Sequence, residues 1–214
     1  MNVFVLAIIA AIILLDKYAV GEFGVSQPII SGTIIGAIFG DISSGIFLGA
    51  LLQLIFLGES PFGGDIEPDG QAAGIIGTGS YFLLVSSNPL EYSLFLAIVF
   101  ALVGGIIGGV LNMYAHVYNE KLYRVFMEKK HLLYVCHFAG LVTAFLRGLC
   151  LLLPIFILAH IVTIPRAFPQ LTKELLMIIG LSVGLSNGLY LFVKKSTILY
   201  LCGGIACSLL LFVL

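Results

Sequence analysis

The chain has 214 residues, of which 60% are hydrophobic and 10% are charged, and its mean hydropathy is +1.16. An ordinary soluble domain carries about 25% charged residues, so this composition predicts an integral membrane protein. The length allows about six to eight segments of ~20 apolar residues, which makes a separate soluble enzyme domain unexpected. We therefore expect a single all-α, polytopic membrane domain over residues 1–214, without a role in nucleic-acid binding.

Charge is distributed unevenly along the chain, although the net charge is only −1. Residues 1–91 hold eight acidic residues and one base, whereas residues 92–214 hold nine bases and three acidic residues. The cysteines and histidines do not have metal-ligand spacing, so neither a metal nor a cofactor is expected. We predict a solute-handling half built from hairpins over residues 1–86 and a scaffold half with longer spans over residues 87–214.

The first half consists of apolar segments that are too short to cross a bilayer unaided. Val3–Leu15 predicts an interfacial or partly inserted helix, or a helix extended by the residues that follow, and residues 16–27 predict a loop. Residues 28–40 and 44–58 carry glycines at four-residue spacing, which allows close helix packing. Because about 30 Å of hydrocarbon needs about 20 helical residues, we predict a re-entrant hairpin, or helices broken at mid-depth, beginning at Pro28.

An acidic loop follows this hairpin. It holds Glu59, Asp65, Glu67 and Asp69 within eleven residues. Residues 71–86 then predict a second short re-entrant element, because they are apolar and rich in glycine. Carboxylates held between short membrane segments are typical of transporters that bind a polar solute near the middle of the bilayer.

The second half contains longer apolar segments. Residues 91–115 predict a long span, and residues 116–131 predict a cytoplasmic amphipathic surface helix, because they carry four bases. That helix would lie on anionic lipid or dock a soluble partner. Residues 132–164 predict one crossing that is tilted, kinked or broken, and residues 175–193 and 196–214 predict two further spans.

An ordered set of spaced residues in the first half resembles a known family. The set comprises a QPII segment beginning at Gln27, a Gly-Asp turn at Gly40, a G-x3-G pair beginning at Gly45, and the loop GGDIEPDG beginning at Gly63. It is similar, in order and spacing, to the IIC membrane subunits in the mannose/fructose/sorbose family of the bacterial sugar phosphotransferase system. The resemblance covers residues 5–80, and the FLRGL segment around Arg147 resembles the family more loosely.

The resemblance implies a permease subunit of the bacterial cytoplasmic (inner) membrane that binds and translocates a hexose or amino-hexose. Such a subunit would work in an oligomer with a IID-type membrane subunit. Cytoplasmic IIA and IIB proteins would phosphorylate the sugar, so this chain would carry no phosphoryl group of its own. Its histidines need not be catalytic, and whether the chain counts as part of an enzyme depends on those partners.

Two departures from the family pattern leave alternatives open. Gln53 stands where family members often carry a carboxylate, and Asp65 and Glu67 add charge where small residues are common. The C-terminus also comes earlier than in the family. These features would suit a different sugar or a degenerate scaffold or regulatory subunit without transport activity, while the membrane carboxylates would also suit an ion-coupled secondary transporter.

Carboxylates and amides suit a sugar because they hydrogen-bond its many hydroxyl groups. Asp69, directly after Pro68, is the first candidate for sugar binding, and it is also placed to cap the helix that follows. Gln53 either contacts the sugar or forms an interhelical hydrogen bond. Asp65 and Glu67 are either further sugar ligands or solvated loop charges.

Two charged residues are expected to have structural roles. Asp41, in an Asp-x-Ser-Ser turn, should cap the second helix of the hairpin. Arg147 lies near the middle of an apolar segment, where an arginine costs about 2.5–3.5 kcal/mol on an insertion scale. We expect it to pair with an acidic residue of the 59–69 loop or with backbone carbonyls at a broken helix, and direct sugar contact is the alternative.

Overall fold

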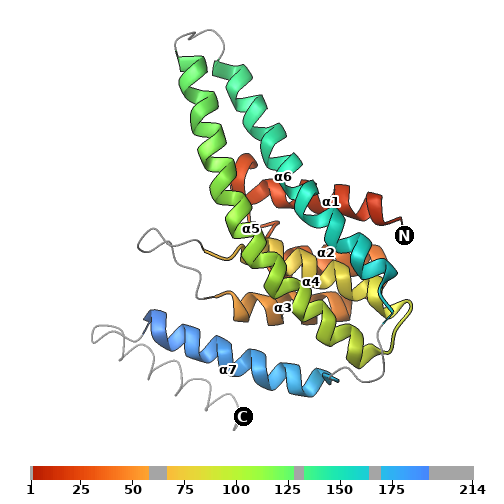
Figure 1. Ribbon diagram of the computed structural model, residues 1–214. Coiled ribbons are helices and arrows are strands. Elements are labelled where there is room, and N and C mark those ends of the chain that lie inside the picture. Colours follow the sequence, from red (N-terminus) through yellow and green to blue (C-terminus); the bar gives the residue numbers. More distant parts are fainter. Residues whose placement is uncertain (1, 58–66, 128–132, 164–169, 193–214) are drawn as a thin grey trace.

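The computed structural model describes residues 2–57, 67–127, 133–163 and 170–192, and in these ranges the chain is helical without a strand. The helices follow one another in the order α1 (Val3–Leu15), η1 (Asp16–Val20), α2 (Pro28–Phe39), α3 (Ile42–Ile55), α4 (Gly70–Val85), α5 (Leu90–Met127), α6 (Leu133–Ile161) and α7 (Lys173–Phe192). The expected all-α architecture with short helices in the first half is therefore confirmed (Figure 1).

Helices α2 and α3 form the predicted hairpin. Pro28 begins α2, Gly40 ends it in the left-handed conformation with φ 80°, and Asp41 caps α3 by accepting a hydrogen bond from Ser44 N at 3.0 Å. The helices have 12 and 14 residues, or about 18 and 21 Å, which is less than the ~30 Å hydrocarbon layer. A Cβ on Gly49 would collide with the carbonyl oxygen of Pro28, so the glycines permit this close pairing.

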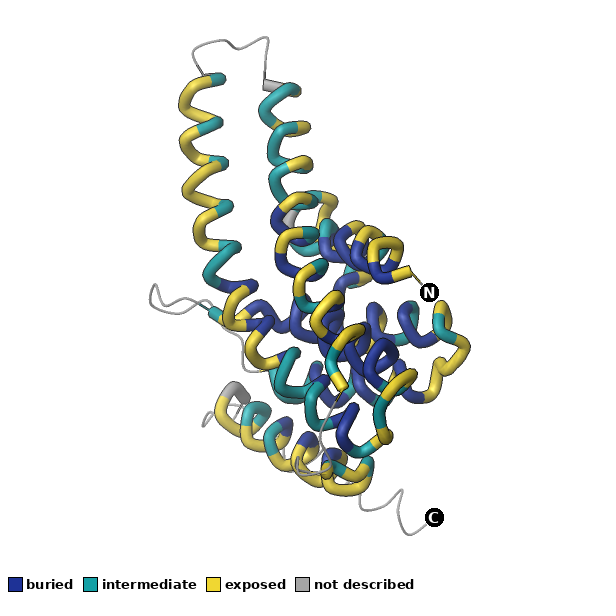
Figure 2. Tube along the Cα trace, turned by 45° about the vertical axis from the view of Figure 1, so that its right-hand side comes forward, coloured by how far each residue is buried: buried dark blue, intermediate teal, exposed yellow. Residues whose placement is uncertain are grey.

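Helix α4 forms the centre of the molecule. All residues from Gly70 to Leu84 are buried, which Figure 2 shows as a continuous dark segment. The hairpin helices α2 and α3 pack on α4, and so do α5 and α6. Small residues, such as Gly74 against Pro28 and Gly77 against Leu52, allow this dense contact. The positions of polar groups at the ends of α4 are therefore fixed by the packing around the helix.

The long helices α5 and α6 lie side by side and project beyond the other helices as an arm (Figure 1). With 38 and 29 residues, they measure about 57 and 44 Å. Among the described residues, their segments Leu90–Phe126 and Tyr134–Ile161 are the helices long and apolar enough to cross a membrane. Helix α6 is continuous, with Pro154 inside it, so residues 133–161 form one unbroken element and the alternative of a broken helix is not observed.

Two sequence-based boundaries were wrong. Residues 116–127 continue α5 instead of forming a separate surface helix, because no glycine or proline interrupts them and Arg124 pairs with Glu120 one turn earlier. Residues 16–20, expected in a loop, form the helical turn η1, which agrees with the alternative of an extended first helix, and the loop begins only at Gly21 with φ 125°. Among the other expected elements, the span over 196–214 lies outside the described residues.

Helix α7 packs against α3 through two of its glycines. Cβ atoms on Gly180 and Gly184 would crowd the side chains of Leu51 and Leu54. Asn187 donates from Nδ2 to the carbonyl oxygens of Leu54 (3.3 Å) and Ile55 (3.1 Å), which satisfies the C-terminal end of α3. The hairpin is thus held between α4 on one side and α7 on the other.

Candidate functional site

Asp69 fixes the N-terminal end of α4. Its side chain accepts a hydrogen bond from Ala72 N at 3.1 Å, so the predicted cap is confirmed. Its backbone N–H donates to the carbonyl oxygen of Gly105 in α5 at 2.7 Å. Asp69 is only 2% exposed. The start of α4 is therefore attached to α5 by a backbone hydrogen bond.

The carboxylate of Asp69 also joins three elements by ion pairs. Lys17 in η1 places Nζ 3.2 Å from Oδ1, and Arg147 in α6 places a guanidinium nitrogen 3.6 Å from Oδ2. The side chain of Arg147 is 6% exposed. The expected pairing of Arg147 with an acidic residue of the 59–69 loop is confirmed, whereas Lys17 was not predicted as a partner.

The segment before Asp69 lies against two glycines of α5. A Cβ on Gly108 would lie 3.0 Å from Cβ of Asp69, and one on Gly109 would collide with the carbonyl oxygen of Glu67. The Glu67 side chain buries its Oε1 atom without a hydrogen-bond partner among the described residues. Pro68 is exposed. Asp65 lies outside the described residues, so its predicted role stays a prediction.

A small polar pocket of about 250 Å³ lies between the α2–α3 hairpin and the start of α4. It is lined by three glutamines, an aromatic ring and small or apolar residues: Gln27, Pro28, Gln53, Phe56, Leu57, Gly70 and Gln71. We call it the glutamine pocket. Asp69 adjoins it through Gly70, but the side chain of Asp69 is not part of the lining.

Two of these glutamines are hydrogen-bonded to each other across the hairpin. Gln53 donates from Nε2 to Oε1 of Gln27 at 2.8 Å, and it accepts at Oε1 from Ile29 N at 3.2 Å. One of the two sequence-based alternatives for Gln53, an interhelical hydrogen bond, is therefore observed. Since Gln53 also lines the pocket, sugar contact remains a prediction for it.

The third glutamine belongs to a buried network that the sequence analysis missed. Ser26 Oγ donates to Gln71 Oε1 at 2.6 Å, and the same hydroxyl lies 3.2 Å from Oδ2 of Asp16. Asp16 also accepts from the backbone N–H groups of Phe23 (2.7 Å) and Ser26 (3.1 Å). This network ties the loop after η1 to the start of α4.

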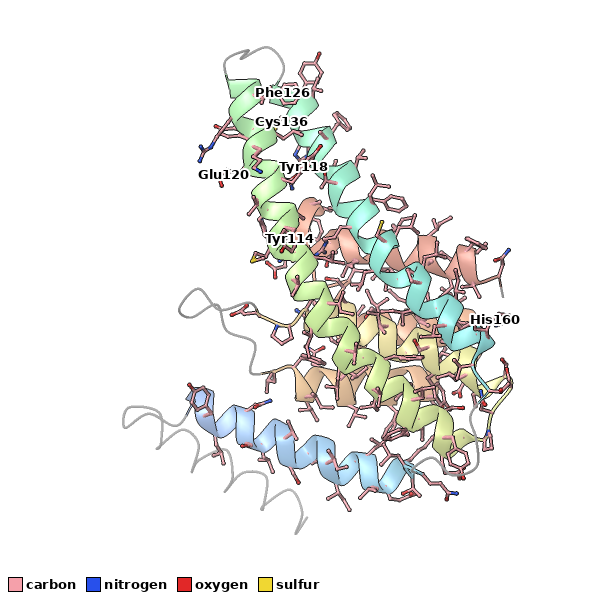
Figure 3. All side chains as sticks on the ribbon, viewed as in Figure 1. Tyr114, Tyr118, Glu120, Phe126, Cys136 and His160 are labelled. Carbon is pink, nitrogen blue, oxygen red and sulfur yellow. The ribbon has the colours of Figure 1, made fainter. Side chains whose placement is uncertain are left out.

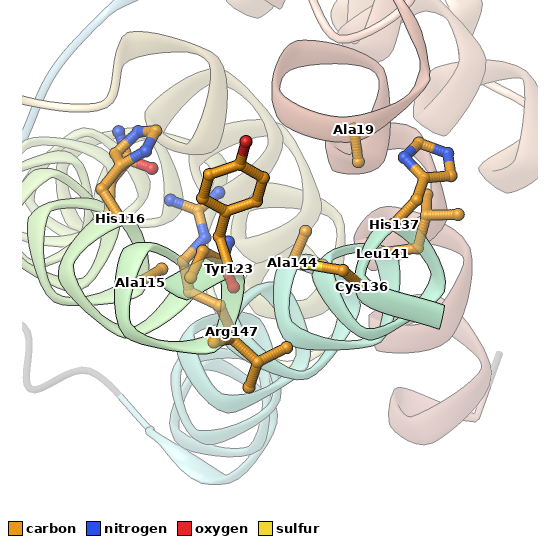
Figure 4. A pocket seen from close by; sticks show the side chains of 13 residues that line it. Ala19, Ala115, His116, Tyr123, Cys136, His137, Leu141, Ala144 and Arg147 are labelled. Carbon is orange, nitrogen blue, oxygen red and sulfur yellow. The ribbon is translucent and has the colours of Figure 1, made fainter. Parts of the chain in front are cut away.

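A second cavity of about 420 Å³ lies in the α5–α6 arm (Figure 4). Tyr123 and His116 come from α5, and Cys136 and His137 come from α6. Arg147, which pairs with Asp69, also lines this cavity. The described residues contain no group of three His, Cys, Asp or Glu side chains that could hold a metal ion.

Helices α2 and α3 are too short to span a bilayer, and they pack on a buried central helix with polar groups at its end. This arrangement is typical of membrane proteins of the transporter type. The sequence model of one family, described as the PTS system sorbose-specific IIC component, matches residues 1–213. The chain belongs to this family, and the resemblance found in the sequence is confirmed.

Individual relatives match shorter segments. The mannose-specific EIIC component of Escherichia coli (strain K12) is 39% identical over 57 residues, and the sorbose-specific EIIC component of Klebsiella pneumoniae is 44% identical over 55 residues. The match spans 27% and 26% of this chain and 21% of each relative. A putative N-acetylgalactosamine permease IIC component 2 of Escherichia coli (strain K12) is 30% identical over 101 residues, which is 47% of this chain and 74% of that relative.

Two solved structures share the fold. One, described as a membrane protein, superposes with a TM-score of 0.70 at 23% identity and covers 96% of this chain and 84% of its own. The other is a cryo-EM structure of the mannose transporter ManYZ with a microcin. It has a TM-score of 0.54 at 21% identity, and the match again covers 96% of this chain and 84% of the other. Both support the helical membrane architecture.

Proposed function

We propose that the chain is the IIC permease subunit of a phosphotransferase-type sugar transporter in the bacterial cytoplasmic membrane, and that it binds a hexose-sized sugar in the glutamine pocket. The observation that carries this proposal is the convergence of three amide side chains and the Phe56 ring on one pocket beside a short hairpin. Amides hydrogen-bond hydroxyl groups in both directions, and an aromatic ring packs against the apolar face of a sugar.

The pocket volume supports one sugar ring. At ~30 Å³ for each water, 250 Å³ corresponds to about eight waters, which is roughly the volume of a monosaccharide. The names of the three relatives refer to mannose, sorbose and N-acetylgalactosamine, and all three are monosaccharides or their derivatives. Sugar transport is therefore a function that the family and the pocket support together.

In this proposal Asp69 acts mainly by positioning the end of α4 that forms one wall of the pocket. Its ion pairs with Lys17 and Arg147 hold Gly70 and Gln71 in place. A direct bond between Asp69 and the sugar remains an open prediction, because the carboxylate lies one residue from the lining. Glu67 and Asp65 remain weaker candidates for sugar contact.

The proposal includes partners that the chain needs for transport. A IID-type membrane subunit would complete the permease, and cytoplasmic IIA and IIB proteins would phosphorylate the sugar after translocation. The hairpin would move as a unit against the scaffold of longer helices, carrying the sugar between the two membrane faces. A crosslink between the hairpin and α5 that leaves uptake intact would argue against this movement.

The test is sugar binding to the purified complex of this chain with its IID-type partner. We expect saturable binding, and Gln53→Leu should weaken it about tenfold, since it removes one hydrogen-bonding side chain and leaves Gln27 unpaired. Gln170→Leu is the matched control, because Gln170 lies outside the pocket and bonds Tyr92. A folded complex that binds no sugar would overturn the proposal in favour of a scaffold or regulatory subunit.

Asp69→Asn in the same assay separates positioning from direct contact. A positioning residue affects all sugars equally, whereas a ligand affects most the sugars that carry the bonded hydroxyl. Uptake that needs a sodium or proton gradient, without phosphorylation, would instead indicate a secondary transporter.

A further inference from the structure

The cavity of about 420 Å³ between α5 and α6, which we call the arm cavity, has a polar wall (Figure 4). The α5 side of this wall is formed by Asn112, His116, Asn119 and Tyr123, together with smaller or apolar residues. The four polar residues are three or four positions apart, so their side chains lie on one face of the helix. This face of α5 is turned toward α6, since residues of both helices line the same cavity.

The outer face of the arm is apolar by contrast. Tyr118 and Val125 on α5 and Phe138 and Val142 on α6 are all exposed. A helix pair surrounded by water shows the reverse arrangement, with apolar side chains inside and polar ones outside. Polar side chains on the inner side of apolar membrane helices are typical of a water-filled path or a solute site. The arm therefore has the arrangement of a membrane element around a polar interior.

Small residues of α6 leave room in this interior. Gly140 and Ala144 line the arm cavity, and no atom lies within 4 Å of a Cβ added to Gly140. At Gly49 and Gly180, in contrast, an added Cβ would collide with a neighbouring helix. Glycine at position 140 is therefore not required for helix packing. It leaves open space that a small solute can fill.

The arm cavity lies beside the cytoplasmic end of the arm. Residues 116–131, which include the end of α5, carry four bases, and this number predicts the cytoplasmic side. His116 and Tyr123 belong to this segment, line the cavity and are exposed. The cavity is therefore accessible from the side on which cytoplasmic partners would act.

The end of the arm cavity nearest α4 carries charges of both signs. Arg147 lines the cavity and pairs with Asp69, which Lys17 also faces. Glu67 lies against Gly109, one turn before the polar face of α5, and its Oε1 atom is buried. An added anion would face the two carboxylates, and an added cation would face the two basic side chains. The surroundings therefore favour an uncharged solute.

The polar face of α5 suits the hydroxyl groups of such a solute. Amide, imidazole and phenol groups all donate and accept hydrogen bonds. Asn119 buries its Oδ1 atom, which has no hydrogen-bond partner among the described residues. Because a buried acceptor without a partner is destabilising, a hydroxyl group that donates to Asn119 would stabilise this site.

We propose that the arm cavity is a second sugar site, which the sugar occupies after it leaves the glutamine pocket and before the cytoplasmic partners receive it. The proposal rests on the proposed function, because it takes the solute to be the same neutral sugar. Arg147 links the two sites. It lines the arm cavity, and its partner Asp69 directly precedes Gly70 in the wall of the glutamine pocket.

Cys136, a native cysteine that lines the arm cavity, reports on its occupancy. The purified complex with the IID-type partner is treated with N-ethylmaleimide, with or without a saturating amount of the hexose that it binds most tightly. We expect the sugar to slow the alkylation of Cys136 at least tenfold, as measured by mass spectrometry. Tyr118→Cys is the matched control, because Tyr118 is exposed on α5 and lies outside the cavity, and its alkylation rate should not change.

Two results of this labelling would overturn the proposal. One is an equal alkylation rate of Cys136 with and without sugar. The other is a Cys136 that does not react even in the sugar-free complex, because the cavity would then be closed or filled by the partner subunit. A complex that binds no sugar would instead contradict the proposed function itself.

Gly140→Leu separates this site from the glutamine pocket. The leucine side chain would fill the open space in the arm cavity without a collision at its Cβ. We expect sugar affinity to stay within about twofold and uptake with the cytoplasmic partners to fall at least tenfold. Gly188→Leu on α7 is the matched control, since its Cβ also meets no atom within 4 Å and it lies outside the cavity. Normal uptake in Gly140→Leu would overturn the proposal, and so would loss of sugar binding together with uptake.

Discussion

The core formed by the α2–α3 hairpin and α4 differs from the α5–α6 arm in how its shape is determined. In the core, backbone meets backbone at glycines, and the polar side chains bond one another. In the arm, side chains such as Tyr114 and Tyr118 are exposed along the projecting half of α5 (Figure 3). The structure of the arm thus depends mainly on helix propensity, whereas that of the core depends on specific contacts. The same type of substitution should therefore change stability more in the core than in the arm.

The largest difference is expected for acidic residues changed to their amides. Asp69→Asn keeps the cap of α4 but removes the buried negative charge that Lys17 and Arg147 both face, which should lower the free energy of unfolding by about 3–5 kcal/mol. Glu120→Gln removes the partner of Arg124 in the arm, where both side chains are exposed, and should cost at most ~0.5 kcal/mol. Denaturant unfolding in detergent measures the free energy of unfolding of both variants. Equal losses of stability would contradict the distinction between the two regions.

Glycine substitutions should give the next largest difference. Gly49→Val places side-chain atoms against the Pro28 carbonyl and should destabilise the hairpin by about 3 kcal/mol. At Gly140 in α6 no atom lies within 4 Å of an added Cβ, so Gly140→Val should be tolerated. Thermal unfolding and the yield of monodisperse protein compare the two variants. A stable Gly49→Val protein would mean that the hairpin helices can separate at little cost.

Serine hydroxyls offer the smallest of the three comparisons. Ser26→Ala leaves Gln71 without its buried donor and should cost about 1–3 kcal/mol in unfolding free energy. Ser182→Ala removes a hydroxyl that bonds its own helix on the exposed face of α7, so a change within ~0.5 kcal/mol is expected. An unchanged unfolding free energy in Ser26→Ala would indicate that the Asp16 network contributes nothing to the stability of the core.

Local sequence patterns predicted much of this core. The glycine spacing predicted the hairpin, the Asp-x-Ser-Ser turn predicted the cap by Asp41, and the isolated charge of Arg147 predicted a partner in the acidic loop. Each of these depends on a strong local requirement, namely close backbone approach, an unsatisfied helix end or a buried charge. Such requirements can be recognised without knowing the tertiary fold.

The remaining parts of the site depend on contacts between distant segments. Lys17 and Asp69 are 52 positions apart, and Ser26 and Gln71 are 45 positions apart. Nothing near either residue indicates its partner, because a polar residue after an apolar run is equally suited to solvent. The four-base segment after residue 115 was misjudged for a related reason, since its charges indicate a membrane side and not the end of a helix.

The hydrogen bond from Asp69 N to the Gly105 carbonyl has a consequence for how such a protein can change over evolutionary time. Both atoms belong to the main chain, so no side-chain substitution removes the acceptor. Only a proline at position 69 would remove the donor. The bond requires glycine at positions 108 and 109, because a side chain there would displace the segment that contains Glu67 and Asp69. The glutamines that line the pocket can therefore vary while this main-chain hydrogen bond stays the same.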